Sequence, residues 1–144
     1  HGSKHRQQVY ADGRFTVMDD SYNASPASMK AALDVFQGLT GKRHIAVLAD
    51  MKELGEQSPR FHREIGTFLA DHPVDVLFTF GELAREIEEG AKEANVGCDC
   101  HHFDVEEREA LFEAVAKTLQ PGDCVLLKGS NSMKLQELAS QLLK

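Results

Sequence analysis

Short apolar runs alternate along this chain with helix-like repeats of apolar residues. Residues 44–49 (HIAVLA) and 124–128 (CVLLK) are continuous apolar runs, of a length typical of buried parallel strands. Between such runs, apolar residues recur three and four positions apart, as at residues 29–36, which predicts helices with one buried face. The alternation of the two patterns predicts a domain built from both strands and helices.

Turn and capping residues divide the chain into its expected elements. The pair at 12–13 (DG) predicts an antiparallel hairpin between residues 8–11 and 14–18. Ser25-Pro26 and Ser58-Pro59 are typical helix starts, a polar cap followed by proline. The remaining expected elements are a strand at 74–80, a helix at 83–95, a weaker strand at 98–103, a helix capped by Asp104, the strand at 124–128 and a last helix after residues 129–130.

Strands joined by helices of this length imply crossover connections and a mostly parallel sheet. The expected fold class is therefore α/β, a Rossmann-like, mostly parallel sheet with helices on both faces and an N-terminal antiparallel hairpin strand. No repeat, linker or low-complexity tract divides the sequence, so residues 1–144 are expected to form a single domain.

The composition argues against some classes of binding partner for this protein. Lys and Arg number 16 against 23 Asp and Glu, and the net charge of -7 argues against a dedicated nucleic-acid or anionic-membrane binder. No apolar run approaches the roughly 20 residues that span a bilayer. No apolar stretch follows residues 1–6, so we expect no signal peptide there. Three cysteines cannot all pair, which favours reduced thiols and a cytoplasmic protein.

Ligands of open α/β sheets bind beyond the carboxyl ends of the strands, so the loops leaving the strands are the candidate site. These loops are residues 19–25, 50–57, 81–82 and 128–132. In the first loop Asp20 suits a ribose hydroxyl or a metal ion, Tyr22 can lie against a purine ring, and Asn23 can bond its edge. The alternative is that Asp20, Ser21 and Asn23 only organise the turn before the helix.

The last loop begins with Lys128 and leads into an expected helix start rich in hydroxyl groups. Anion binding fits this pattern, because free N–H groups point outward at a helix N-terminus. A capped helix start with an exposed lysine is the alternative. The Walker A spacing occurs nowhere in the chain. In residues 50–57, Asp50 and Glu53, with His62 downstream, can contact a ligand or a neighbouring domain, but caps and surface salt bridges are the commoner role.

Residues 98–102 (CDCHH) carry metal-ligating side chains. Strand alternation places Cys98, Cys100 and His102 on one face. A structural zinc site takes four ligands, usually from two separated knuckles, and the sequence holds no second knuckle. We therefore expect no bound metal in this segment.

Four motifs in order resemble the C-terminal domain of MurF-type Mur ligases, over nearly the whole chain. Residues 19–29 (DDSYNASPASM) resemble D-D-S-Y-N-A-N-P-x-S-M, and residues 48–55 (LADMKELG) resemble G-D-M-x-E-L-G. Ser58, His62 and Gly66 match the S-x-x-x-H-x-x-x-G that follows. Residues 121–133 (PGDCVLLKGSNSM) resemble P-G-D-x-V-L-V-K-G-S-R-S-M.

The resemblance implies the third domain of a three-domain enzyme of peptidoglycan biosynthesis, without its uridine-nucleotide and P-loop domains. In such enzymes ATP phosphorylates the carboxylate of UDP-N-acetylmuramoyl-tripeptide, with Mg²⁺ held mostly by the central domain. The amine of D-alanyl-D-alanine then attacks the acyl phosphate. The third domain closes over ATP and helps to bind the dipeptide. The resemblance implies a monomer, and a third domain that is inactive alone.

Carried over motif by motif, the resemblance assigns ATP binding to Asp20, Tyr22 and Asn23. It assigns substrate binding to the last loop, at Lys128, Ser130, Asn131 and Ser132, and no catalytic residue to this domain. Three positions depart from the family pattern. Asn131 stands in place of an arginine and cannot supply its charge to a carboxylate. Ser25 replaces an asparagine but can still cap a helix, and Ala49 replaces a glycine, which implies an ordinary backbone conformation there.

Three alternatives share part of the pattern. A response-regulator receiver has an acidic pair, an acceptor aspartate and a lysine at strand ends, as Asp19-Asp20, Asp50 and Lys128 would be. The N-terminal hairpin is foreign to receivers. Another member of the Mur ligase and folylpolyglutamate synthase superfamily, or a stand-alone adenine-nucleotide binding module, also fits the fold pattern.

Overall fold

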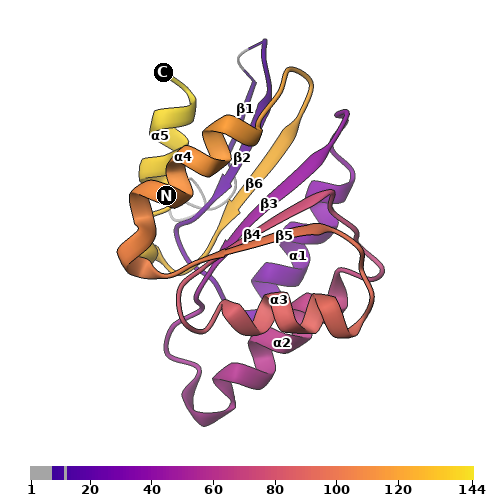
Figure 1. The fold of residues 1–144 in the computed structure, drawn as a ribbon, viewed down its shortest axis with the longest axis vertical. Helices are drawn as coiled ribbons and strands as arrows, with labels where there is room; N and C mark the ends of the chain where they lie inside the picture. The colour runs from indigo at the N-terminus through magenta and orange to yellow at the C-terminus, as the bar shows by residue number, and fades with distance from the viewer. Residues whose placement is uncertain (1–7, 12) are drawn as a thin grey trace.

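Six strands form one sheet in the computed structural model, which describes residues 8–11 and 13–144. The sheet order is β1-β2-β6-β3-β4-β5; β1 runs antiparallel to β2, and every other neighbouring pair is parallel (Figure 1). The strands are β1 (Gln8–Ala11), β2 (Thr16–Asp20), β3 (His44–Ala49), β4 (Val76–Phe80), β5 (Asp99–Phe103) and β6 (Cys124–Lys128). The expected hairpin pairing is confirmed, although residues 1–7 and Asp12 of its turn lie outside the described residues.

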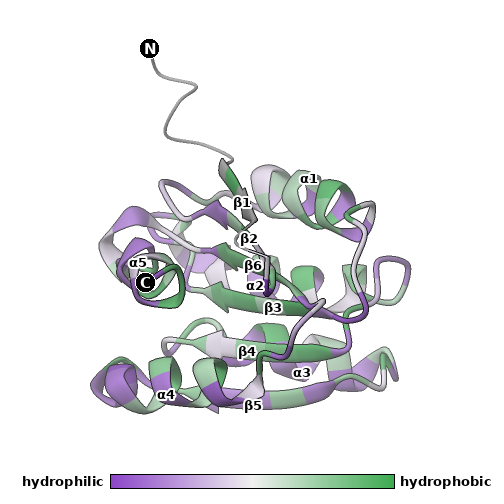
Figure 2. Cartoon of the chain, turned by 90° about the horizontal axis from the view of Figure 1, so that it is seen from above, coloured by the Kyte–Doolittle hydropathy of each residue, from purple (hydrophilic) through white to green (hydrophobic). Residues whose placement is uncertain are grey.

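Helices cover both faces of the sheet, which confirms the expected fold class. They are α1 (Pro26–Gln37), α2 (Ser58–Phe68), α3 (Arg85–Glu93), α4 (Arg108–Thr118) and α5 (Gln136–Leu142). Figure 1 shows α1, α2 and α3 on one side of the sheet and α4 and α5 on the other, and Figure 2 shows the strand β3 between them in the green of hydrophobic residues. Among the described residues, three short 3₁₀ turns join strands to helices: η2 (Gly55–Gln57), η3 (Val105–Glu107) and η4 (Asn131–Met133).

The central strand β3 is buried on both faces and divides the apolar residues into two cores. Ala46 and Leu48 face the core that α1, α2 and α3 cover. Ile45 and Val47 face the core beneath α4 and α5. A strand covered on both sides needs a continuous apolar run, which is what residues 44–49 supply.

The helix α1 begins where its capping residues place it. Ser25 Oγ accepts a hydrogen bond from the Ser28 amide (3.1 Å), and Ser28 Oγ accepts one from the Ser25 amide (2.9 Å), forming a capping box before Pro26. This start fixes the end of the loop after β2 and confirms the helix predicted at Ser25-Pro26. In the part of the chain that the structure describes, no helix is long and apolar enough to span a bilayer.

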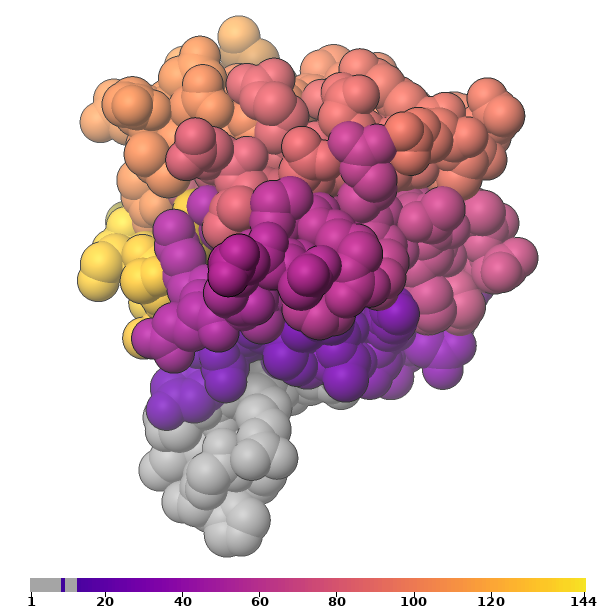
Figure 3. All heavy atoms as spheres, turned by 90° about the horizontal axis from the view of Figure 1, so that it is seen from below, coloured from indigo at the N-terminus to yellow at the C-terminus, as the bar shows by residue number. Residues whose placement is uncertain are grey.

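The helices α2 and α3 approach each other at glycine positions. From below, the magenta surface around α2 lies between the indigo N-terminal segments and the salmon surface of α3 (Figure 3). A Cβ atom on Gly66 would lie 2.1 Å from the Ile87 carbonyl oxygen, and one on Gly90 would lie 2.1 Å from that of Arg63. The two backbones are therefore in direct contact, with no room for a side chain at either glycine.

Candidate functional site

The parallel strands bring the predicted loops to one edge of the sheet. Because β2, β3, β4, β5 and β6 run in the same direction, their carboxyl ends meet there. In the register of β2 and β6, Asp20 lies opposite Lys128, so the first and last candidate loops leave the sheet side by side. The order of the strands thus joins segments that are 108 residues apart.

A buried ion pair connects the first and last loops. Lys128 Nζ donates to Asp20 Oδ2 at 2.8 Å and to the Asn23 carbonyl oxygen at 2.9 Å. Lys128 is 2% exposed and Asp20 is 5% exposed. Charge-assisted hydrogen bonds in such a dry environment hold both groups in one geometry. Lys128 therefore fixes the shape of the first loop from beneath, and the exposed lysine of the alternative interpretation is wrong.

The first loop is organised by its own side chains as well. Asp19 Oδ1 accepts hydrogen bonds from the amide and the hydroxyl of Ser21, and Asn23 Oδ1 accepts one from the Ala24 amide at 2.9 Å. These bonds are of the kind that polar residues make in turns. Tyr22 is half exposed. The loop therefore combines an internally bonded frame with a partly exposed aromatic ring.

A pocket of about 340 Å³ lies over this loop. It brings together all three residues predicted to bind ATP with one residue predicted to bind substrate. Its lining residues are Asp20, Tyr22, Asn23, Ser25, Ser28, Ala31 and Lys128. A carboxylate, a phenol ring, an amide and serine hydroxyls form a suitable set for a sugar hydroxyl and a flat, hydrogen-bonding ring.

The last loop is attached to the second loop. Ser130 Oγ accepts a hydrogen bond from the Lys52 amide at 2.7 Å, and the Ser130 amide donates to the Asp50 carbonyl oxygen at 2.9 Å. Asn131 and Ser132 are exposed in the turn η4. The helix predicted directly after residues 129–130 begins only at Gln136, so the expected helix N-terminus does not lie at this loop.

Asp50 ties the second loop to the loop after β4. Its Oδ1 atom accepts a hydrogen bond from the Ala84 amide at 2.7 Å, and Lys52 Nζ lies 3.4 Å from its Oδ2 atom. Gly81, with φ of +111°, passes so close that a Cβ atom there would lie 2.4 Å from Asp50 Oδ1. Glycine is required here both by the positive φ and by the space. Asp50 is therefore a buried connector, with its carboxylate at the edge of the sheet.

A second recess, of about 410 Å³, opens beside this connector. Acidic side chains dominate its wall, which is formed by Asp50, Lys52, Glu82, Asp104, Val105 and Glu106. Asp104 and Glu106 were not among the predicted site residues. Asp104 directly follows β5, so the strand-end rule applied to the loop after residues 98–103 would have found this part of the recess.

His62 supports the second loop from within α2. The buried imidazole donates through Nδ1 to the Ser58 carbonyl oxygen (2.6 Å) and accepts through Nε2 from the Met51 amide (2.9 Å). This pairing requires the neutral ring, because a protonated Nε2 cannot accept. Burial lowers the pKa of His62, against a smaller opposing effect of its Ser58 contact. His62 is thus a structural support of the loop and does not reach either pocket wall.

The pKa shift of His62 gives stability a defined pH dependence. The unfolded chain binds a proton at this histidine near pH 6.5, about the usual value, whereas the folded chain binds it only at lower pH. The stability that neutral His62 contributes is therefore fully present above this pH and is lost as pH falls. The free energy of unfolding then falls by up to about 1.4 kcal/mol per pH unit from this group. Urea unfolding between neutral and mildly acidic pH measures this slope.

A matched pair of variants isolates the contribution of His62. His62→Gln keeps a possible acceptor for the Met51 amide but cannot titrate, so its stability should fall less steeply on acidification. Val35→Ala, at an exposed residue that does not titrate, should retain the slope of the unaltered chain. Equal slopes for the unaltered chain and His62→Gln would contradict this assignment.

The remaining histidine and cysteine cluster does not converge on a metal site. His102 bonds Thr79 Oγ1 through Nδ1 at 2.7 Å and Asp104 Oδ1 through Nε2 at 3.0 Å. Cys98 and Cys100 lie against each other instead. Within residues 8–11 and 13–144, no group of three or more metal-ligating side chains comes together.

The sheet order and the polar pockets at its carboxyl edge define an α/β domain with a candidate ligand site at that edge. Comparison with known families then identifies it: the chain belongs to the family described as Mur ligase, glutamate ligase domain, whose model matches residues 5–131. This membership confirms the predicted resemblance. The receiver alternative is not supported, and the buried, hydrogen-bonded carboxylate of Asp50 does not fit an accessible phosphoacceptor.

Individual relatives agree with the family. The UDP-N-acetylmuramoyl-tripeptide--D-alanyl-D-alanine ligase of Bacillus subtilis is 36% identical over 137 residues, covering 94% of this chain and 30% of the relative. The ligase of the same name from Synechocystis is 39% identical over 142 residues, covering 97% and 30%. The crystal structure of MurF ligase from Thermotoga maritima in complex with ADP superposes with a TM-score of 0.77 at 25% identity, covering 96% and 30%. The chain thus spans about 30% of the length of these proteins.

Proposed function

We propose that this chain is the C-terminal part of a three-domain, ATP-dependent ligase that joins D-alanyl-D-alanine to UDP-N-acetylmuramoyl-tripeptide in peptidoglycan biosynthesis. The names of the relatives and the four motifs in register support this function. The relatives are more than three times as long as this chain, and we assign the uridine-nucleotide and phosphate-binding parts to that further length. Such an enzyme works in the cytoplasm, where its nucleotide substrates are.

The observation that carries the proposal is the pocket over the first loop. Tyr22 provides a face for adenine, Asn23 a hydrogen-bonding amide, and Asp20 a carboxylate for the ribose. The polar residues around this pocket fit the nucleoside end of ATP. Bound ATP would supply the phosphoryl group that activates the substrate carboxylate, and Mg²⁺ would accompany its phosphates on the central domain.

The residues of the last loop take different parts in this proposal. Lys128 positions the first loop through its bonds to Asp20 and the Asn23 carbonyl. Ser130 holds the second and last loops together. Asn131 and Ser132 are exposed beside them and are the residues that we assign to contacts with the dipeptide or the closing domain.

Adenosine binding by this chain tests the pocket without phosphates or metal. Titration with adenosine should shift the backbone amide NMR signals of residues 19–23, and Tyr22→Ala should weaken binding about tenfold, because a stacked base contributes ~1–3 kcal/mol. Tyr22 is half exposed, so its removal should leave the fold intact. Val35→Ala, at an exposed apolar residue outside the pocket lining, is the matched control and should bind as the unaltered chain does. Signals at 19–23 that stay fixed during the titration would contradict the assignment.

A further inference from the structure

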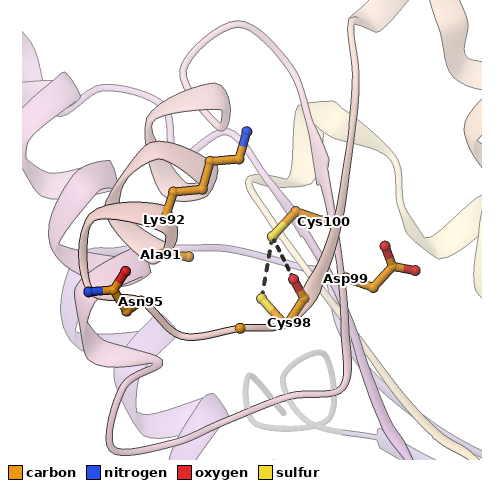
Figure 4. Close-up of a pocket in the computed structure, with 7 residues that line it drawn as sticks. Ala91, Lys92, Asn95, Cys98, Asp99 and Cys100 are labelled. Atoms are coloured by element: carbon orange, nitrogen blue, oxygen red, sulfur yellow. Dashed lines mark hydrogen bonds between the residues drawn. The ribbon is translucent and has the colours of Figure 1, made fainter.

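Two of the three cysteines lie side by side at the start of β5. The sulfur atoms of Cys98 and Cys100 are 3.3 Å apart, and the Cys100 thiol lies 3.5 Å from the Cys98 carbonyl oxygen (Figure 4). The third, Cys124, is buried elsewhere and donates to the Thr40 carbonyl oxygen at 3.2 Å. Cys98 and Cys100 therefore form a dithiol, separate from Cys124.

The dithiol borders a recess of about 430 Å³. The recess lies between the end of α3 and the start of β5, with Lys92 and Asn95 on its helical side (Figure 4). Because it adjoins the amino end of β5, it is at the opposite edge of the sheet from the two polar pockets. The proposed ligase site does not use these thiols.

We propose that Cys98 and Cys100 are a redox-active modification site, which a small-molecule disulfide such as oxidised glutathione converts to an intramolecular disulfide bond. The sulfurs must move from 3.3 Å to about 2.05 Å. Cys98 directly precedes β5, and Cys100 is its second residue. Even in an extended backbone, residues two apart have Cα atoms only about 6.6 Å apart, inside the disulfide limit of about 6.8 Å. The covalent bond is therefore compatible with the strand after a small adjustment.

The backbone around the dithiol can make that adjustment. β5 is the last strand in the sheet order, so only one neighbouring strand, β4, pairs with it. Gly97, with φ of +78°, comes directly before Cys98 and has no atom within 4 Å of its Cβ position. A glycine in open space beside an edge strand allows local rotation without a clash.

The oxidation consists of two thiol–disulfide exchanges. The Cys98 thiolate attacks one sulfur of oxidised glutathione, and the first glutathione leaves as its thiolate. The Cys100 thiolate then attacks Cys98 in the mixed disulfide, and the second glutathione leaves. Two electrons pass from the protein sulfurs to the small disulfide, and the two protons of the cysteine thiols end on the two glutathione thiols.

Cys98 is the cysteine that attacks first. The Cys100 proton is directed to the Cys98 carbonyl oxygen. Burial raises the pKa of Cys98, and burial together with the neighbouring Cys98 raises the pKa of Cys100 to about 12. Since only the thiolate is nucleophilic, oxidation is slow at neutral pH and accelerates as pH rises, by up to about tenfold per unit.

Mass spectrometry after incubation with oxidised glutathione at mildly alkaline pH tests the proposal. The unaltered chain should lose the mass of two hydrogen atoms and, after unfolding, should retain only Cys124 for alkylation. Its proteolytic peptide that contains both Cys98 and Cys100 should carry the disulfide bond. Cys100→Ser should stop at a mixed disulfide of Cys98 with one glutathione, and Cys98→Ser, which lacks the thiol that attacks first, should be modified more slowly. Three alkylatable cysteines in excess oxidant, or an unaltered chain that accumulates the mixed disulfide, would overturn the proposal.

Two further measurements use the unaltered chain alone, in case a serine variant does not fold. The rate of thiol loss should rise with pH as described, and a rate independent of pH would contradict the thiolate mechanism. Adenosine titration of the oxidised chain should match that of the reduced chain, because the dithiol and the nucleoside pocket lie at opposite edges. Failure of the nucleoside site and failure of the dithiol are thus observed separately.

Discussion

Lys128→Met should lower the free energy of unfolding by about 3–5 kcal/mol, the usual cost of removing one member of a buried ion pair. Methionine keeps most of the volume of the lysine stem but leaves the Asp20 carboxylate, 5% exposed, without the cation at 2.8 Å. The Asn23 carbonyl loses its donor as well. Urea unfolding at neutral pH, with the midpoint and slope fitted together, measures the effect.

A double variant distinguishes the broken pair from a simple loss of packing. Asp20→Asn combined with Lys128→Met removes both charges, so it should be more stable than Lys128→Met alone, because no unbalanced buried charge remains. Lys52→Met is the matched control at a half-exposed lysine, which lies 3.4 Å from Asp50, and should cost less than about 1 kcal/mol. A Lys128→Met chain as stable as Lys52→Met would contradict a structural role for the pair.

The pair also leads us to expect a joint effect of these two residues on adenosine binding. Lys128 holds the turn that carries Tyr22 and Asn23, so its removal should weaken adenosine binding even though its ammonium group already bonds the protein. An Asp20→Ala variant would disturb the pocket in the same way. The half-exposed Tyr22 is consequently the better test of direct contact with a base.

The sequence defines the central strands well because their burial requires a continuous apolar run. Residues 44–49 and 124–128 were predicted with the same bounds as β3 and β6. Helix ends were less accurate: the helix predicted at 83–95 spans Arg85–Glu93. The last helix begins six residues after Ser130, because Lys134 takes a left-handed conformation (φ of +56°) between η4 and α5. Hydrophobic periodicity alone does not indicate that break.

Local sequence patterns do not predict the order of the strands in the sheet, and the candidate site depends on that order. The spacing of elements predicted a mostly parallel sheet, but only the insertion of β6 between β2 and β3 places Lys128 beside Asp20. For the same reason Lys128 could be predicted at a strand end but not as a buried partner of the first loop. Pairings between distant segments follow from the whole fold, whereas turns and caps follow from a few neighbouring residues.

Gly90→Ala should destabilise the chain by about 3 kcal/mol, although alanine in a helix usually stabilises by ~1 kcal/mol relative to glycine. The added Cβ would lie 2.1 Å from the Arg63 carbonyl oxygen, and that atom belongs to the α2 backbone, which cannot rotate away. The helices must separate instead. Gly66→Ala should act similarly, since its Cβ would meet the Ile87 carbonyl oxygen at 2.1 Å.

The contact between α2 and α3 should also affect the loops at the carboxyl edge of the sheet, because each of these helices follows one of those loops. Ala84, just before α3, donates to Asp50, so separation of the helices should broaden or shift NMR signals at residues 50–52 and 81–84. Gly38→Ala is the matched control: Gly38 has φ of -81°, and its Cβ would make an ordinary 3.5 Å contact. That variant should stay within about 0.5 kcal/mol of the unaltered chain. If Gly90→Ala instead gained stability, as an open helix position would, the two backbones could not be in contact at that crossing.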